Sequence, residues 1–327
     1  MIIWREFQGD KDEWNKITYD LNISSYAQMY NWGEVKDSSH LKVQRIIGID
    51  NLNVVCAAQV FYKKLPLSFI FVWIPGGPLG PLKYFDNHFI KFLKIKNKVK
   101  FIFCKSDFYR LKLEKDINVL KLNNWSKSVF KLNSGLSLNY NPSIEINKRL
   151  NEASKNWKRN LKRSIKKSPE PYQVNNLKEF ELKEIYNELN NYKGIKANVD
   201  FIQMKLIISK FSENIILYRC DNLEGKIISF RGSLYFKNLG WDIFAATSIE
   251  GRKLYSSYSV FWDLMKSCSN KNINRYDMGG INPKKNPGVY NFKKGSGAEL
   301  VSFIGEWDFS SHFILRYICN LILKFKK

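Results

Sequence analysis

Short apolar runs, each long enough for one strand, alternate with segments of helical periodicity along this chain. "SFIFVWIP" and "KVKFIFCK" are rich in β-branched and aromatic residues, and a helical pattern at 86–97 separates them. "VQRIIGID" and "NVVCAAQVFYK" flank "DNLN" as the strands of a hairpin would. Strands that alternate with helices of ordinary length predict the α/β (α+β) class, with mixed sheets flanked by helices.

A similar order of elements returns in the second half. Two helical segments, "LKEFELKEIYNELNNYKG" and "VDFIQMKLIISKFS", precede the strand-like runs "NIILYRC", "KIISFRGSLYF" and "GWDIFAAT". A helical segment, "YSSYSVFWDLMKSC", then leads into the strand "INRYDMGG". A chain of 327 residues is long enough for two domains. We therefore expect an internal duplication of topology, although the halves share no visible sequence identity.

The formal net charge of +23 is compatible with a polyanionic partner. Lysine supplies most of this charge and asparagine is abundant, so a biased genome composition explains it equally well. In the basic segment 148–167, helical spacing places Leu150, Trp157, Leu161 and Ile165 on one stripe beneath a basic face. That face is either solvated or directed at phosphates.

No pattern predicts secretion, a metal site or a membrane span. The five cysteines are odd in number and widely spaced, which is typical of small core residues. The N-terminus lacks the pattern of a signal peptide, and the apolar run at 65–82 is broken by Pro and Gly. We expect a soluble, cytoplasmic protein. Its segment 310–327 is either a helix docked on the first domain or a peripheral contact with the inner face of the plasma membrane.

Five stretches of the chain together form a recognisable pattern. They are "YAQMYNWGEVK", "WIPGGPLGP", "NWKRNLKRSIKKS", "FAATSIEGRKLYSSYSVFWDLMK" and, the most specific, "YDMGGINPKKNPGVYNFKKGSGAELVSFIGEWD" at 276–308. These stretches resemble the Fem-type (FemABX) aminoacyltransferases, whose fold is a pair of GNAT-like (acyl-CoA N-acyltransferase-like) domains. The resemblance implies a first domain, 1–147 plus 305–327, that holds the acceptor. A second domain, 148–304, would hold the aminoacyl donor.

Members of this family move an amino acid from aminoacyl-tRNA to an amine of a peptidoglycan precursor, which is carried on UDP or on a lipid. The resemblance thus implies aminoacyl-tRNA as co-substrate, with no cofactor. The long charged heptad arm of some members is missing here, so we expect a monomer. Two alternatives stay open: an N-acyltransferase that uses an acyl thioester on an amino sugar of a surface polysaccharide, and a non-enzymatic RNA-binding protein.

The resemblance assigns catalysis to "YNFKKG" and to one acid of the first half. Lys293 matches the lysine at the reacting end of the tRNA acceptor stem, where an ammonium can neutralise a ribose-phosphate or a developing oxyanion. Phe292 could stack on a base or close off the site. Asp107, expected at a strand end, could orient the amine or take its proton. Gly295 and Gly297 are expected to let backbone come close. The ordinary alternatives are a solvated lysine in a glycine-rich turn and an aspartate turn cap.

The resemblance assigns substrate binding first to Lys36 and Trp32. They lie in "YNWGEVK", which corresponds to the stretch expected to hold a phosphate of the UDP or lipid carrier. A lysine that only complements the end of a helix is the simpler reading. The sequence departs from the family at Gly76 and Gly77, where an arginine is common, and Lys196 is the nearest counterpart of a second arginine. These departures keep an amino-sugar acceptor open. Further candidates for precursor or tRNA contacts are Arg231, Arg252, Tyr255, Tyr258, Gly279 and Gly280.

Overall fold

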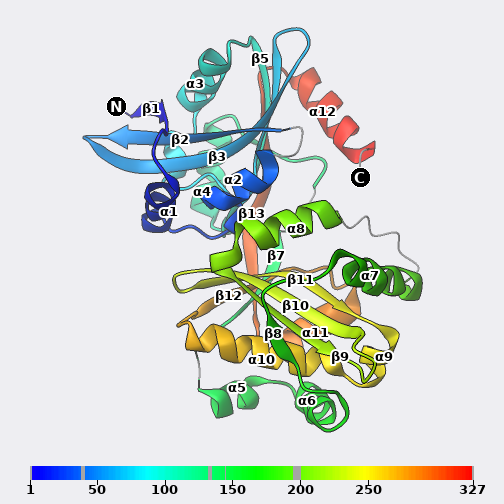
Figure 1. Cartoon of the computed structure of the whole chain (residues 1–327). Helices are drawn as coiled ribbons and strands as arrows, with labels where there is room; N and C mark the ends of the chain where they lie inside the picture. Colours follow the sequence, from blue (N-terminus) through cyan, green and yellow to red (C-terminus); the bar gives the residue numbers. More distant parts are fainter. Residues whose placement is uncertain (1, 38–40, 132–134, 144, 194–199, 326–327) are drawn as a thin grey trace. The chain divides into compact units, whose positions relative to one another are not determined.

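The computed structural model describes residues 2–37, 41–131, 135–143, 145–193 and 200–325 (Figure 1). The chain forms two compact units. Unit 1 comprises Met1–Gly135 and Ser302–Lys327, and unit 2 comprises Leu136–Val301. The acceptor and donor roles of the two predicted domains stay predictions.

Unit 1 is built on a mixed sheet whose neighbouring strands are antiparallel except for the parallel pair β4 and β5. The helix α3 (Asn87–Asn97) connects this parallel pair, as the pattern at 86–97 predicts, and Asp86 caps its N-terminus. A short strand, β6 (Ser126–Lys127), also pairs with β13. The sheet order is β1 (Ile3–Glu6), β2 (Lys42–Asp50), β3 (Asn53–Leu65), β4 (Phe69–Ile74), β5 (Phe101–Leu111) and β13 (Glu299–Ser310).

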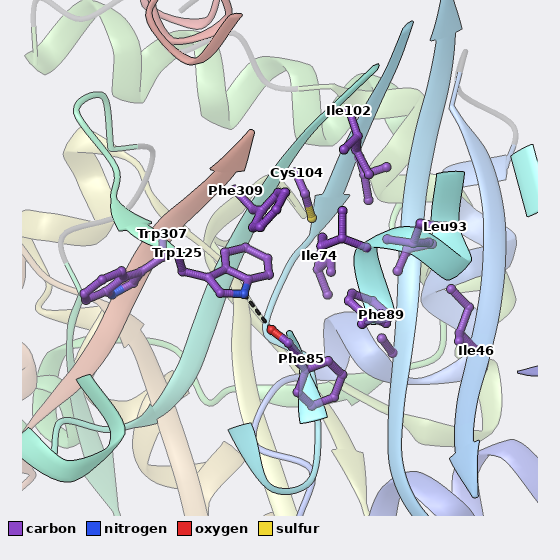
Figure 2. Packing of buried hydrophobic residues seen from close by; sticks show 14 of the residues in the cluster. Ile46, Ile74, Phe85, Phe89, Leu93, Ile102, Cys104, Trp125, Trp307 and Phe309 are labelled. Atoms are coloured by element: carbon purple, nitrogen blue, oxygen red, sulfur yellow. Dashed lines mark hydrogen bonds between the residues drawn. The ribbon is translucent and has the colours of Figure 1, made fainter. Parts of the chain in front are cut away.

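Aromatic and aliphatic side chains together form the core of unit 1 (Figure 2). Trp125 is buried, and its indole Nε1 donates a hydrogen bond of 2.7 Å to the carbonyl of Phe85. Phe85 and Phe89 pack edge to face with ring centroids 5.2 Å apart. The other helical elements of unit 1 are α1 (Lys11–Asp20), η1 (Tyr26–Gln28), α2 (Tyr30–Asp37), η2 (Leu82–Tyr84), α4 (Glu114–Leu122) and α12 (Phe313–Phe325).

Unit 2 repeats the same succession of pairings. Three antiparallel steps lead from β8 to β11, the β11–β12 pair is parallel, and the last step to β7 is antiparallel. The predicted mixed sheets flanked by helices are thus confirmed. The sheet order is β8 (Tyr172–Val174), β9 (Ile215–Asp221), β10 (Ile227–Phe236), β11 (Leu239–Thr247), β12 (Arg275–Gly280) and β7 (Leu136–Tyr140).

The helices of unit 2 pack on this sheet around Trp157, Phe261 and Tyr276, which are all buried. β10 is buried along most of its length. The helical elements are α5 (Ile146–Glu152), α6 (Lys155–Lys167), α7 (Glu179–Lys193), α8 (Phe201–Lys210), η3 (Ser212–Asn214), α9 (Ile249–Lys253), α10 (Ser256–Asn270) and α11 (Pro287–Gly295).

Two segments differ from the sequence-based expectation. The basic segment 148–167 is two helices rather than one, because Ser154 caps the N-terminus of α6 with its hydroxyl. Ile165, predicted on the apolar stripe, is 66% exposed, because the buried side of α6 continues through Ser164. The residues before Lys293 form α11 rather than a loop, since Pro287 occupies the first helical turn.

Candidate functional site

Lys293 lies on α11 and is buried, with 7% of its surface exposed. Its ammonium nitrogen, Nζ, donates to the carbonyl of Met278 and lies 3.3 Å and 3.5 Å from the carbonyl oxygens of Gly279 and Gly280. The structure therefore brings three of the predicted site residues together at the end of β12. It excludes the simpler reading of Lys293 as a solvated turn lysine.

The end of β12 has a local reason to present carbonyl groups to this lysine. Gly279 has a φ of +77°, in the left-handed region that favours glycine. The backbone N–H of Gly279 donates to Oδ1 of Asp277 over 2.8 Å, and the Ser137 hydroxyl donates to the same carboxylate. Asp277 thus holds the turn that directs the strand's last carbonyls toward Nζ.

The electrostatic setting of Lys293 lowers its pKa. Burial is the main cause, because removing an ammonium from water disfavours its charged form. The carboxylates of Asp242 and Asp277 oppose this shift, while the Arg231 guanidinium adds to it. The ammonium of Lys293 therefore loses its proton more readily than that of a solvated lysine.

Arg231 and Asp242 form a buried ion pair on neighbouring strands of the same unit. Arg231 Nε lies 2.8 Å from Asp242 Oδ1 and Nη2 lies 3.0 Å from Oδ2, a bidentate geometry. The guanidinium carbon also lies 5.1 Å from the ring centroids of both Phe261 and Phe292. Arg231 thereby fixes the position of Phe292, one residue before Lys293, and is itself neutralised by Asp242.

Phe292 belongs to an aromatic cluster that includes Tyr258. Their ring centroids lie 5.0 Å apart, edge to face. The Tyr258 hydroxyl accepts a hydrogen bond of 3.0 Å from Asn160 of α6. The Tyr255 hydroxyl accepts one of 3.1 Å from Arg163 of the same helix. Tyr255 and Tyr258 thus connect the aromatic cluster to the basic helix α6.

Arg252, another predicted contact residue, has a different environment. Its guanidinium carbon lies 4.7 Å from the ring centroid of Tyr192. Lys196 lies outside the described residues.

Gly295 and Gly297 serve helix packing in the structure. A Cβ at Gly295 would come within 3.2 Å of Ser154 Oγ and of the Trp157 indole. Gly297 has a φ of +96° and lies against Glu152. These glycines let the end of α11 approach α5 and α6. The backbone that comes close to them is that of Glu152 and Ser154.

In unit 1, Lys36 and Trp32 lie together on α2. The Lys36 ammonium is 5.0 Å from the Trp32 ring centroid, a cation–π contact. Trp32 is buried at 8% exposure and packs edge to face on Tyr26. Trp32 therefore packs beside Lys36 and exposes little of its own surface to solvent.

Asp107 lies inside β5, not at a strand end, because β5 continues to Leu111. It is buried and stands opposite Glu306 of β13 in the strand register. Lys105 lies two residues before Asp107 in β5, and its ammonium is 3.0 Å from the Glu306 carboxylate and 3.3 Å from that of Asp308. The turn-cap reading of Asp107 is wrong, since the residue belongs to a buried row of charged side chains.

The glycines that replace a common arginine of the family are required by packing. Gly76 has a φ of +66°, and a Cβ there would overlap the side chain of Ser25. A Cβ at Gly77 would come within 2.6 Å of the Gln28 side chain. An arginine at either position would need a rearranged η1.

Asp242 and Asp277 also belong to this site, although no sequence motif assigns them to it. A signal was present, because Asp242 in "GWDIFAAT" and Arg231 in "KIISFRGSLYF" are single charges within otherwise apolar strands. Buried charges need partners, so two such strands are expected to pair side by side.

Among the residues that the structure describes, no group of three His, Cys, Asp or Glu side chains could hold a metal ion. Across the same residues, every helix is too short or too polar to cross a membrane.

Comparison with known proteins agrees with this architecture. Residues 221–324 match the model of the FemAB family, and no curated protein sequence matches the chain. The fold is similar to that of FemX, with a TM-score of 0.81 and 16% identity over 97% of this chain and 100% of that chain.

Two further structures share the fold at a greater distance. L-PGS from Bacillus licheniformis has a TM-score of 0.56 and 11% identity over 97% of this chain and 96% of its own. A tandem GNAT protein from the clavulanic acid biosynthesis pathway has a TM-score of 0.55 and 8% identity over 95% of this chain and 99% of its own. These likenesses confirm the GNAT-like fold.

Proposed function

Because residues 221–324 match the model of the FemAB family and the chain has a GNAT-like fold, we propose that it transfers an aminoacyl group from aminoacyl-tRNA to an amine of a peptidoglycan precursor. The observation that carries the proposal is the buried Lys293 at the end of β12, inside the segment 221–324 that matches the FemAB family. A buried cation with two long contacts to backbone carbonyls is suited to a transient anion.

The proposed reaction is aminolysis of an ester. The amine nitrogen of the acceptor attacks the aminoacyl carbonyl, a C–N bond forms, and the negative charge moves to the carbonyl oxygen. The C–O bond to the terminal ribose then breaks, the ribose oxygen takes up a proton, and the amine loses one. No protein nucleophile is needed, and positioning with charge stabilisation supplies the acceleration.

Lys293 is the residue proposed to stabilise the developing charge. The contacts of 3.3 Å and 3.5 Å to Gly279 and Gly280 are long for hydrogen bonds, so an anionic oxygen can replace them. Phe292, held by the Arg231 guanidinium, would pack beside the terminal nucleotide of the donor. Lys36 is proposed to hold a phosphate of the UDP- or lipid-linked acceptor, and Asp107 to orient its amine.

The experiment combines charged tRNA with UDP- and lipid-linked precursors and detects the product by mass spectrometry. Wild-type protein is expected to give a precursor heavier by one aminoacyl residue. Lys293→Ala should lower kcat by roughly 100-fold, the scale of losing one oxyanion-stabilising group, with a smaller change in KM.

Lys294→Ala is the matched control, because Lys294 is exposed on the same helix. It is expected to keep turnover within about twofold of wild type, as is usual for a substitution at an exposed position. Equal activity of the two variants would remove the role proposed for Lys293.

A second candidate is an N-acyltransferase that takes an acyl thioester, which the likeness to a tandem GNAT protein favours. A coenzyme A site needs free backbone N–H groups at a helix start. At α9 the N–H of Gly251 is already bonded to the Ser248 hydroxyl over 3.0 Å. A thermal-shift measurement with coenzyme A decides between the two, since stabilisation by coenzyme A would support the thioester donor.

A further inference from the structure

The C-terminal helix α12 carries a broad apolar face that is exposed to solvent. One row along the helix is Phe313, Tyr317 and Leu321, the next is Ile314, Ile318 and Ile322, and Phe325 lies at the end. Each of these side chains is at least 47% exposed. We call this surface the α12 face. Single exposed apolar residues are ordinary, but a continuous face of this kind on one helix marks an interaction site.

The polar side of α12 is the side that docks on unit 1. Asn320 is buried at 3% exposure, and its Nδ2 donates to Asp308 Oδ2 over 2.8 Å. Its Oδ1 accepts from the backbone N–H of Phe130 over 3.3 Å. Nη2 of Arg316 donates to the carbonyl of Lys127 over 2.6 Å.

This docking fixes the rotation of the helix. Asp308 is buried and also contacts the Lys105 ammonium and the Ser128 hydroxyl. If α12 rolled to cover its apolar face, Asp308 would lose Asn320 and a buried carboxylate would be left short of a hydrogen bond, which is costly. The buried charges thus impose the outward orientation of the α12 face.

The charge around the α12 face selects the kind of partner. No acidic residue follows Asp308 in the sequence, whereas Lys324, Lys326 and Lys327 are all basic. An apolar helical face with aromatic residues and a cationic end suits the surface of a bilayer that contains anionic lipids. As no described helix is long and apolar enough to cross a membrane, the contact would be superficial.

We propose that the α12 face binds the surface of an anionic phospholipid bilayer. The helix would lie in the plane of the membrane, with its apolar rows among the upper acyl chains and Lys324 among the headgroups. This inference goes beyond the transfer reaction, and it depends on neither the donor nor the acceptor.

The test is flotation of the full chain with vesicles of phosphatidylglycerol and phosphatidylcholine, and with vesicles of phosphatidylcholine alone. Binding is expected to the anionic vesicles, to weaken with added salt, and to be far weaker on the neutral ones. The double variant Tyr317→Ser, Leu321→Ser should weaken vesicle binding by at least about tenfold, because it removes two large side chains from the inserted face.

The matched control is the double variant Leu52→Ser, Leu223→Ser. Both leucines are almost fully exposed but lie on separate turns far from the chain's C-terminal helix in sequence. It should bind vesicles like wild type. Hydrogen exchange of the wild-type protein supplies a readout that needs no variant, and vesicles are expected to slow exchange at 313–325.

Three outcomes would overturn the proposal. They are absence of binding to anionic vesicles, equal binding by the Tyr317→Ser, Leu321→Ser variant, and unchanged exchange at 313–325. If sedimentation equilibrium shows a dimer that the same variant abolishes, while vesicles are not bound, the face belongs to a second copy. No tRNA or precursor is present in these assays, so their failure is separate from failure of the transferase proposal.

Discussion

At the scale of single residues, the burial of Lys293 is the feature with the most consequences. A lysine in a helix that follows a glycine- and proline-rich segment is usually solvated, yet here backbone carbonyls surround its ammonium. The folded protein disfavours the charged form and lowers the pKa. This lysine thus makes the stability of the protein depend on pH.

The sign of that dependence follows from linkage. Because the pKa is lowered from 10.5 on folding, the unfolded chain binds more protons between the two pKa values, and stability rises with pH in that interval. The free energy of unfolding of wild type relative to Lys293→Met is expected to increase toward pH 10.5, by at most ~1.4 kcal/mol per pH unit.

Urea denaturation of both proteins over this pH range measures the difference. Lys294→Met, which removes an exposed lysine from the same helix, should not reproduce the trend. A difference between wild type and Lys293→Met that stays constant with pH would contradict the buried, perturbed ammonium.

At the scale of elements, α6 is the most basic helix of unit 2. Its sequence, KNWKRNLKRSIKK, contains no acid, and its buried residues include Trp157 and Leu161. The basic residues Lys155, Lys158, Arg159, Lys162, Arg163 and Lys166 line a hollow of about 470 Å³ on its outer side. Arg163 also contacts Tyr255, so this basic surface is continuous with predicted contact residues of α10.

We expect this surface of α6 to contact phosphates of the donor tRNA. The triple variant Arg159→Gln, Lys162→Gln, Lys166→Gln should weaken tRNA binding, and the plot of log affinity against log salt should become shallower by about 0.9 per lost phosphate contact. Fluorescence anisotropy with labelled tRNA at several salt concentrations measures both quantities.

The matched control is Lys63→Gln, Lys64→Gln, Lys91→Gln, which removes the same charge from exposed lysines of unit 1. If both triple variants lower the slope equally, binding reflects overall charge and the surface of α6 has no special role.

At the scale of the whole molecule, the chain returns from unit 2 to complete unit 1. β13 pairs with β5 and supplies Ile304, Trp307 and Phe309 to the core of unit 1. It also supplies both carboxylates that neutralise the buried Lys105. The first 135 residues alone therefore lack part of their core and leave one cation unpaired.

A polypeptide of residues 1–135 is expected not to unfold cooperatively. An unpaired buried charge costs roughly 3–5 kcal/mol, a large part of the ~5–15 kcal/mol that stabilises a domain. Residues 136–301 contain all six strands of the unit 2 sheet and should unfold cooperatively. Circular dichroism during urea denaturation measures whether each of the two fragments unfolds cooperatively. A cooperative transition for residues 1–135 would refute the idea that unit 1 needs β13 to fold.

Local patterns in the sequence were enough to predict most elements. The hairpin of β2 and β3, the strands β9 to β12 and the helices α3, α7, α8 and α10 follow from periodicity and turn residues, which are local properties. The starts of α1 and α6 are also encoded locally, by the capping box of Asp10 and Glu13 and by the Ser154 cap.

The sequence by itself determined the class of fold and the resemblance to the FemAB family, because apolar periodicity and the stretch 276–308 are properties of contiguous residues. Tertiary structure alone decided that Lys293 is buried, that Arg231 pairs with Asp242, and that α12 turns its apolar face outward. Each of these depends on residues far apart in the chain, and a charge or an apolar face acquires its environment only when those residues meet.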